Sequence, residues 1–206
     1  MAKYAILAAT GQIGQLTTQY LLDHSSADLT LLGHNAAQRL NQFTGNRVSL
    51  VDGDLKDSFA LKKAISGVDA VFLAYVATPD IIEPLIKVMD DSNVKRLIVM
   101  SVPDVYQEVE GPFQTWYREH TGLVWKTNYV DTINTVENSD LDYVILRTTW
   151  LYNDATKTKV TVTKKGEPFK SAQITREAVA KFAAELLENR VDYHRESLGI
   201  GEPNTE

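Results

Sequence analysis

The fold is decided by Ala8-Ala9-Thr10-Gly11-Gln12-Ile13-Gly14, a glycine-containing segment between two patterned stretches. Residues 4–8 form a short apolar run, which predicts a buried strand. Residues 12–24 carry apolar side chains at helical spacing. The segment therefore predicts a strand, a tight turn and a helix in direct succession. Ala8 stands where such turns usually have a glycine, so we expect a turn that keeps the φ angle of Ala8 negative.

Apolar runs and amphipathic stretches go on alternating along the chain. Further strands are predicted at residues 29–32, 48–51, 69–75, 97–100 and 143–146. Helices are predicted at residues 35–43, from Asp57, from Pro79, at residues 130–138 and at residues 175–189. Near-continuous apolar strands between helices are typical of a parallel sheet covered on both faces. We therefore expect an α/β fold, a Rossmann-like doubly wound sheet in a single domain over residues 1–206.

Two longer stretches interrupt this alternation, residues 103–123 and residues 148–171. The second contains a possible hairpin at residues 159–163. Both stretches follow the carboxyl ends of predicted strands, which is where open α/β sheets bind their ligands. We expect the substrate pocket to lie between them.

The first turn predicts an anion site. Gly11 lets the backbone approach a phosphate closely, and Gly14 lets the helix pack against the strand. The first N–H groups of the helix and its dipole then stabilise a pyrophosphate. The segment Ala8 to Gly14 is therefore expected to hold the pyrophosphate of a dinucleotide, and the alternative is a purely structural turn.

The end of the second predicted strand bears on which dinucleotide is bound. Leu31-Leu32-Gly33-His34-Asn35 lacks the carboxylate that usually binds the ribose hydroxyls of NAD. His34 and Arg39 could face a 2′-phosphate there, so NADP is favoured and NAD is the alternative. His34 could equally be a solvated loop residue, and Arg39 a charge on a helix surface. Asp54 could accept a hydrogen bond from the adenine amino group or cap the turn that follows it.

Composition excludes several other classes of protein. The 206 residues carry a net charge of −6 without a basic cluster, which argues against nucleic-acid binding. The chain has no cysteine, and its four histidines do not share a helix face, so we expect no metal site. No run is apolar enough to span a membrane, and the first residues do not have the pattern of a signal peptide. We expect a cytoplasmic protein.

Four segments together carry a family resemblance: residues 8–14, 53–55, 94–101 and 141–147. The chain resembles the atypical short-chain dehydrogenase/reductase superfamily in its NmrA-like, NAD(P)-binding branch, which includes oxidoreductases and epimerase/dehydratase-like proteins. The resemblance implies a Rossmann fold and a nicotinamide dinucleotide, without implying one reaction. It also implies the cofactor-binding residues, which are Thr10, Gly11, Gln12, Ile13 and Gly14 at the pyrophosphate, His34 at the 2′-phosphate, Asp54 and Leu55 at adenine, Ala74, Tyr75 and Val76 along the ribose, and Ser101 facing the nicotinamide. Asn35 and Arg39 are further cofactor-binding candidates beside His34.

The acid/base pair usual in such dehydrogenases, a Tyr with a Lys four residues later, is absent from the sequence. None of the nine tyrosines has this spacing, and the residue four positions after Tyr129 is Ile133. A free phenol is a poor base at neutral pH, so the missing ammonium matters. Ser101 and Tyr129 are the catalytic candidates, with Lys126 as a possible neighbour of Tyr129, and Trp125 and Asp131 as further candidates. The alternative is that Ser101 and Tyr129 only line the cofactor site.

Aromatic residues gather in the two interrupting stretches, namely Tyr106, Phe113, Trp116, Tyr117, Trp150 and Tyr152. They are expected to form a lid or partner surface, or alternatively a small satellite core. Glu110, Arg118 and Glu119 are expected to be solvated.

These observations favour an oxidoreductase that transfers hydride between NADP(H) and a small carbonyl or quinone-like substrate. The alternative is a non-catalytic NAD(P)-sensing binding protein. A sugar-nucleotide epimerase is less favoured, because only about sixty residues follow the sixth strand. The sequence leaves the substrate and the choice between monomer and homodimer open.

Overall fold

The computed structural model describes residues 1–121 and 127–205. Within these residues the main sheet contains β1 (Lys3–Leu7), β2 (Asp28–Gly33), β3 (Val48–Asp52), β4 (Ala70–Val76), β5 (Arg96–Ser101), β6 (Asp142–Thr148), β8 (Thr161–Lys164) and β10 (Glu196–Gly201). The spatial order is β3-β2-β1-β4-β5-β6-β10-β8, and only β8 pairs antiparallel. A separate parallel pair is formed by β7 (Trp150–Tyr152) and β9 (Gln173–Thr175). The first six strands thus have the doubly wound Rossmann order.

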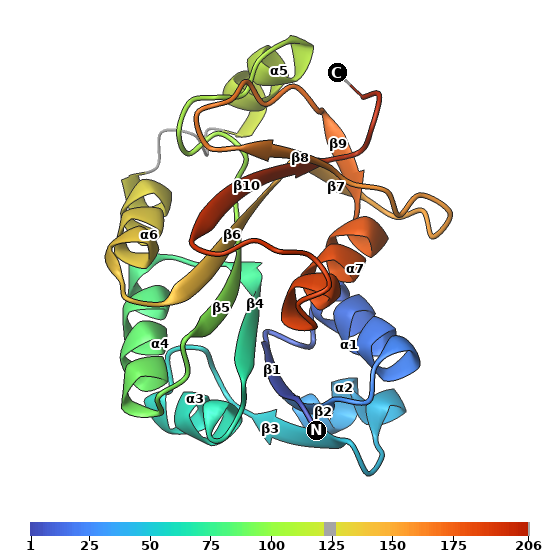
Figure 1. The fold of residues 1–206 in the computed structure, drawn as a ribbon, viewed down its shortest axis with the longest axis vertical. Helices are drawn as coiled ribbons and strands as arrows, with labels where there is room; N and C mark the ends of the chain where they lie inside the picture. The colour runs from blue at the N-terminus through green and yellow to red at the C-terminus, as the bar shows by residue number, and fades with distance from the viewer. Residues whose placement is uncertain (122–126, 206) are drawn as a thin grey trace.

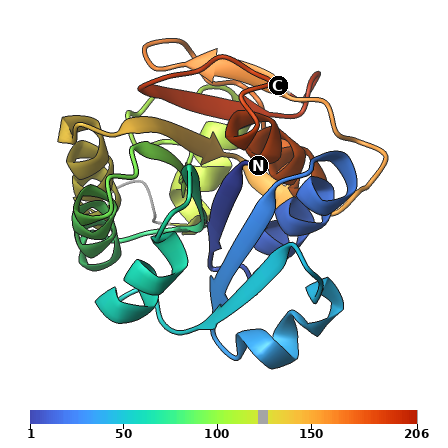
Figure 2. The ribbon, with the colours of Figure 1, turned by 60° about the horizontal axis from the view of Figure 1, so that its bottom comes forward.

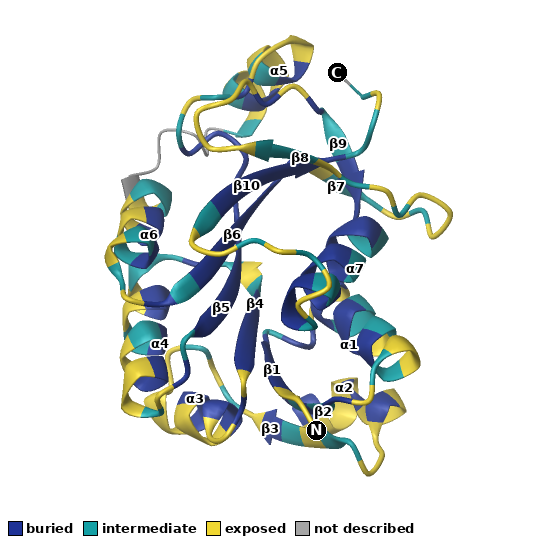
Figure 3. Ribbon diagram, in the orientation of Figure 1, coloured by how far each residue is buried: buried dark blue, intermediate teal, exposed yellow. Residues whose placement is uncertain are grey.

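Helices cover both faces of this sheet (Figures 1 and 2). They are α1 (Gln12–His24), α2 (Ala36–Arg39), α3 (Ser58–Ile65), α4 (Pro79–Asp91), α5 (Pro112–Thr121), α6 (Thr127–Asn138) and α7 (Arg176–Leu187), with a 3₁₀ turn at Asn41–Phe43. Alternate strand residues enter two cores, Ile6 and Phe72 on the side of α1 and α7, and Leu7 and Val71 on the side of α3, α4 and α6. Figure 3 shows the central strands buried and the outer helix faces exposed. The expected α/β single-domain fold is confirmed.

The structure corrects two local expectations. Residues 159–163 do not form a hairpin of their own, because β8 pairs with β10, which lies more than thirty residues later. The strand β10 escaped prediction because it contains two glycines, which lower strand propensity. At Gly199 a Cβ atom would lie 3.0 Å from the ring of Phe169, so the ring occupies the space of the missing side chain.

The helix expected at residues 35–43 is also wrong in part. It is divided into α2 and the 3₁₀ turn, which meet at Leu40. Asn35 precedes α2 in the left-handed region with φ at 52°. An asparagine tolerates this backbone conformation better than most residues do, and it places a turn between β2 and α2.

Two ion pairs fix the segment that follows β5. Arg147 is fully buried, and its Nη1 lies 2.7 Å from Glu108 Oε2 while its guanidinium lies 5.0 Å from the centre of the Tyr106 ring. Asp104, also buried, accepts from Arg118 Nε at 2.8 Å. The expectation that Arg118 is solvated is therefore wrong, since the buried carboxylate of Asp104 needs a charged partner.

Among residues 1–121 and 127–205, no helix has the length and apolar character needed to cross a lipid bilayer.

Candidate functional site

The glycine turn after β1 closes in an unexpected conformation. Ala8 has a φ angle of +56°, so the expected negative angle is wrong. The turn reverses the chain tightly, because the Gly11 N–H donates to the carbonyl oxygen of Ala8 at 3.0 Å. The Ala9 N–H donates to Leu32 O at 2.8 Å and ties the turn to the end of β2. These hydrogen bonds hold an alanine in a region where glycine is more stable.

Close packing at two glycines makes the turn possible. A Cβ atom on Gly14 would lie 2.8 Å from the Cα of Ala9, so only glycine lets α1 approach β1 this closely. At Gly33 a Cβ atom would lie 2.8 Å from the Thr10 side chain. The interpretation of Gly14 as a helix-packing residue therefore agrees with the structure.

The amino terminus of α1 has no side-chain cap. Gly11 is its N-cap in extended conformation, and no acidic residue lies in its first turn. By contrast, Asp57 caps α3 and Thr175 caps α7 through side-chain oxygens. The N–H groups at the start of α1 lack acceptors within the helix, and together with the dipole they form a donor set that fits a pyrophosphate. Ile13 is buried in the core, so it could offer only its backbone to such a ligand.

A hollow of about 310 Å³ lies beside this turn and is called here the turn hollow. It is lined by Ala8, Thr10, Gly33, His34, Gly53, Asp54, Leu55, Lys56, Tyr75 and Ile81. The structure thus brings together Thr10, His34, Asp54, Leu55 and Tyr75 from the predicted set. Lys56 and Ile81 were missed, because each lies near the start of a loop or helix without a motif of its own.

A contact between the His34 and Asp54 side chains crosses the rim of the turn hollow. His34 Nε2 lies 3.0 Å from Asp54 Oδ2, and both side chains are more than half exposed. The Lys56 N–H donates to Asp54 Oδ1 at 2.8 Å, so Asp54 does cap the turn that follows it. This hydrogen bond, followed by the nearby His34, holds the pKa of Asp54 below its usual range. The carboxylate therefore stays ionised beside the place predicted for a 2′-phosphate.

Arg39 points its guanidinium toward the turn. Its Nη2 donates to the carbonyl oxygen of Thr10 at 3.1 Å. The same oxygen accepts from Gln15 Nε2 at 2.9 Å. Arg39 is exposed and lies outside the lining of the turn hollow, so the structure assigns it a contact with the glycine turn.

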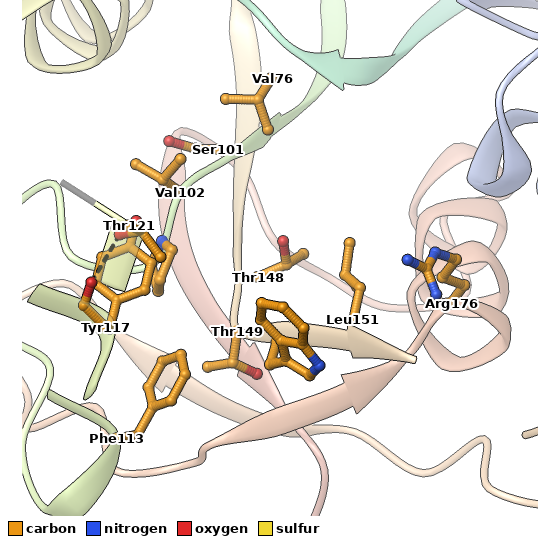
Figure 4. Close-up of a pocket in the computed structure, with 12 residues that line it drawn as sticks. Val76, Ser101, Val102, Phe113, Tyr117, Thr121, Thr148, Thr149, Leu151 and Arg176 are labelled. Atoms are coloured by element: carbon orange, nitrogen blue, oxygen red, sulfur yellow. Dashed lines mark hydrogen bonds between the residues drawn. The ribbon is translucent and has the colours of Figure 1, made fainter. Parts of the chain in front are cut away.

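A second hollow of about 260 Å³, called here the aromatic hollow, lies beyond the ends of β4, β5 and β6 (Figure 4). It is lined by Val76, Ser101, Val102, Pro103, Phe113, Tyr117, Thr121, Thr148, Thr149, Trp150, Leu151 and Arg176. Ser101 is buried at the end of β5, as predicted. The lining joins the two interrupting stretches, as expected, with Thr148 and Leu151 in the second of them, and it adds Arg176, which sequence reasoning missed.

Two neighbouring residues at the end of β4 each line one of the two hollows. Tyr75 lines the turn hollow and Val76 lines the aromatic hollow. The register between β4 and β5 shifts between Leu73 and Val76, an irregularity that is common beside functional sites. Ala74 packs against the core on the side of α7. The carboxyl end of β4 therefore separates two cavities at the point where the strand order reverses, which is the usual place for a dinucleotide.

The aromatic residues divide into a buried group, which forms the expected small core, and an exposed pair. Phe113 and Tyr117 form a small core with Val109 and Phe169, and burial raises the pKa of Tyr117. Trp116 and Trp150, in contrast, are 39% and 54% exposed and meet edge to face with ring centres 5.1 Å apart.

Tyr129 does not share the position of Ser101. It is half-buried against the core on the side of α4, and the described lining of the aromatic hollow does not include it. Trp125 and Lys126, named beside it from the sequence, lie outside the described residues. A catalytic role for Tyr129 stays a prediction.

The glycine turn, the open helix terminus and the strand order define a dinucleotide-binding Rossmann protein. Residues 8–190 match the model of the NAD(P)H-binding family, so the chain belongs to that family. No curated protein matches the sequence.

Solved structures show the same fold. A short-chain dehydrogenase/reductase from Veillonella parvula, crystallised with NADP, is 29% identical over 99% of this chain and 96% of its own, with a TM-score of 0.93. A Rossmann-fold NAD(P)-binding family protein from Shigella flexneri is 25% identical over 100% of this chain and 96% of its own, with a TM-score of 0.78. ChuY, an anaerobilin reductase from Escherichia coli O157:H7, is 17% identical over 100% and 99%, with a TM-score of 0.79, and shows the fold alone.

Proposed function

We propose that the protein is an NADPH-dependent reductase of a small carbonyl or quinone-like substrate. The observation that carries the proposal is the pair of hollows on either side of the end of β4, one beside the glycine turn and one with apolar walls. A dinucleotide that follows the usual path would place adenosine in the first hollow and nicotinamide at the edge of the second. The aromatic hollow then holds the substrate.

The chain's own residues would bind, orient and shield the reactants. The open terminus of α1 binds the pyrophosphate, and Val76 and Ser101 border the nicotinamide. The reduced nicotinamide supplies the hydride when bound. Phe113 and Leu151 exclude water from the hollow, which strengthens polar interactions inside it. The Ser101 hydroxyl can donate a hydrogen bond to a substrate oxygen, and the proton comes from water, Ser101 or Tyr129.

The preference for NADP over NAD rests on the end of β2. His34 directly follows β2, and residues 31–35 at this strand end contain no carboxylate, while the Veillonella parvula relative was crystallised with NADP. A cationic imidazole near a 2′-phosphate would stabilise it, whereas a carboxylate at position 34 would repel it.

Calorimetric titration with NAD, NADH, NADP and NADPH tests binding and preference together. We expect NADP(H) to bind more tightly, and His34→Glu to shift the preference toward NAD(H) by about tenfold, the effect of about 1.4 kcal/mol. The control is Gln38→Glu, which adds the same charge on the exposed surface of α2. Absence of binding by every nucleotide would refute the proposal.

Turnover is tested by following NADPH absorbance with a panel of aldehydes, ketones and quinones. The sequence supports a second candidate, a nucleotide sensor without turnover, because the Tyr–Lys pair is absent and the resemblance extends to the NmrA-like branch. Nucleotide binding without oxidation of NADPH by any substrate would favour the sensor. A partner protein whose binding depends on the ratio of NADP to NADPH would establish it.

A further inference from the structure

A single positive charge lines the aromatic hollow. Among the described lining residues, Arg176 alone is charged, and the others are apolar, aromatic or hydroxyl-bearing. Figure 4 shows Arg176 on the opposite side of the hollow from Tyr117. Arg176 is half-buried at this wall, so its charge is partly desolvated and a ligand anion beside it would form a strong charge-assisted hydrogen bond.

The partner of Arg176 within the protein is neutral. Its Nη1 donates to Asn153 Oδ1 at 2.9 Å, and no carboxylate of the described residues lies within 4.0 Å of it. The arginines of β5, α5 and β6 differ in this respect, because each of them is paired with an aspartate or glutamate. Arg176 therefore keeps its charge available for a ligand.

Arg176 does not stabilise α7, the helix that carries it. It is the first residue of α7, where a positive charge opposes the helix dipole. A basic residue at this place is better explained by the hollow than by helix stability.

We propose that the substrate is a flat aromatic or quinonoid molecule that carries a carboxylate, and that Arg176 binds this carboxylate. The inference rests on the proposed function and names its substrate class. The planar guanidinium binds a carboxylate through two parallel hydrogen bonds, and apolar surroundings strengthen the pair. The half-exposed ring of Trp150 offers a flat surface beside the same cavity.

The pyrophosphate of the cofactor is the competing partner for Arg176. A groove that also includes Asn153 is lined by Gln12, Gln15 and Glu177 and adjoins the start of α1. The carboxylate of Glu177 disfavours an anion in that groove, whereas the aromatic hollow contains no acidic residue among its described lining. The charges therefore favour the substrate as the partner of Arg176.

The test compares 2-naphthoate with 2-naphthamide, two probes of nearly equal shape of which only the first is charged. Binding is followed by quenching of tryptophan fluorescence, with and without saturating NADP. We expect naphthoate to bind about tenfold more tightly than naphthamide, the effect of a charge-assisted hydrogen bond. Arg176→Gln should abolish this preference, and Arg176→Lys should restore part of it. Lys181→Gln, which removes a charge from the same helix outside the hollow, should keep it.

Trp150→Ala tests the aromatic surface independently of the charge. It should lower the affinity for both probes about equally and leave the preference for naphthoate over naphthamide unchanged. Equal affinity of the two probes for the unaltered protein would overturn the proposal. So would an Arg176→Gln protein that keeps the preference and instead loses tenfold in NADP affinity. Failure of the protein to bind any nucleotide would refute the proposed function alone, since the preference measured without NADP reports on the hollow by itself.

Discussion

The turn hollow is lined by residues that follow β1, β2 and β3 together with Tyr75 and Ile81, whereas the aromatic hollow is lined by side chains from distant segments. Ala8, Gly33 and Gly53 in the first present almost no side chain. Phe113, Trp150 and others in the second come from α5, β7 and α7. Substitutions that add atoms should therefore reduce ligand binding in the turn hollow. Substitutions that remove side-chain atoms, or that leave a buried charge without its partner, should destabilise the region of the aromatic hollow.

The largest expected effect is a loss of stability when the ion pair between Glu108 and Arg147 is broken. Glu108→Ala leaves the buried guanidinium of Arg147 without a counter-ion, which should lower the free energy of unfolding by about 3–5 kcal/mol. Urea unfolding measures this loss. Nucleotide affinity at a temperature where the variant is folded should stay unchanged, because the turn hollow is built from other residues.

Two further variants make that result specific. Glu110→Ala removes an exposed carboxylate from the same segment and should change stability by less than about 0.5 kcal/mol. The pair Arg147→Met with Glu108→Leu should recover most of the loss, since it removes both charges together. If Glu108→Ala cost less than about 1 kcal/mol, the ion pair would not be what fixes this segment.

The next prediction separates an effect on protein stability from an effect on nucleotide binding at the glycine turn. Gly11→Asp places a favourable cap at the start of α1, but its Cβ would lie 3.3 Å from the carbonyl oxygen of Ala8, so thermal stability should change little. Its carboxylate would stand where the pyrophosphate binds, and NADPH affinity should fall about 100-fold, or about 2.7 kcal/mol. Calorimetry and thermal unfolding of the same samples measure both quantities.

Gly11→Asn is the matched control, because it adds a cap of the same shape without the charge. It should lose much less affinity than the aspartate variant. Equal losses in the two variants would mean that bulk at the turn, and not charge, limits the binding of the nucleotide.

How far the sequence predicted each hollow follows from this difference in construction. Gly11 and Gly14 were identified because local spacing alone determines a strand, a turn and a helix. Arg176 was missed, and Leu151 was located only within a long stretch, because their place in the aromatic hollow depends on β7 pairing with β9, a contact between segments more than twenty residues apart. Residues whose position is set by such tertiary contacts carry no local signal.

The conformation of Ala8 shows the limit of local reasoning within the turn itself. The sequence predicted a negative φ angle, because alanine disfavours the left-handed region, yet hydrogen bonds from Gly11 and Ala9 hold it there. Ala8→Gly should relieve this conformation and raise the free energy of unfolding by about 1 kcal/mol. Ala9→Gly, at the fully buried neighbouring position, should lower it by a similar amount, so chemical denaturation should give effects of opposite sign. Effects of the same sign would contradict the strained turn.

The smallest effect concerns the rim of the turn hollow, where Asp54 pairs with His34 and faces the predicted 2′-phosphate. Its lowered pKa means that Asp54 stabilises the fold above the usual pH range of carboxyl titration, and that this contribution disappears as the pH falls through its folded-state pKa. At neutral pH the carboxylate is therefore charged and repels a phosphate. Asp54→Asn keeps the acceptor for the Lys56 N–H and removes the charge.

NADPH affinity of Asp54→Asn should consequently rise about threefold while NADH affinity changes little, because an exposed charge is screened by solvent and acts weakly. The control Asp57→Asn keeps a capping residue on α3 and should leave the ratio of the two affinities unchanged. A lower NADPH affinity in Asp54→Asn would mean that the carboxylate acts by orienting His34, so that the phosphate is read by the pair and not by the imidazole alone.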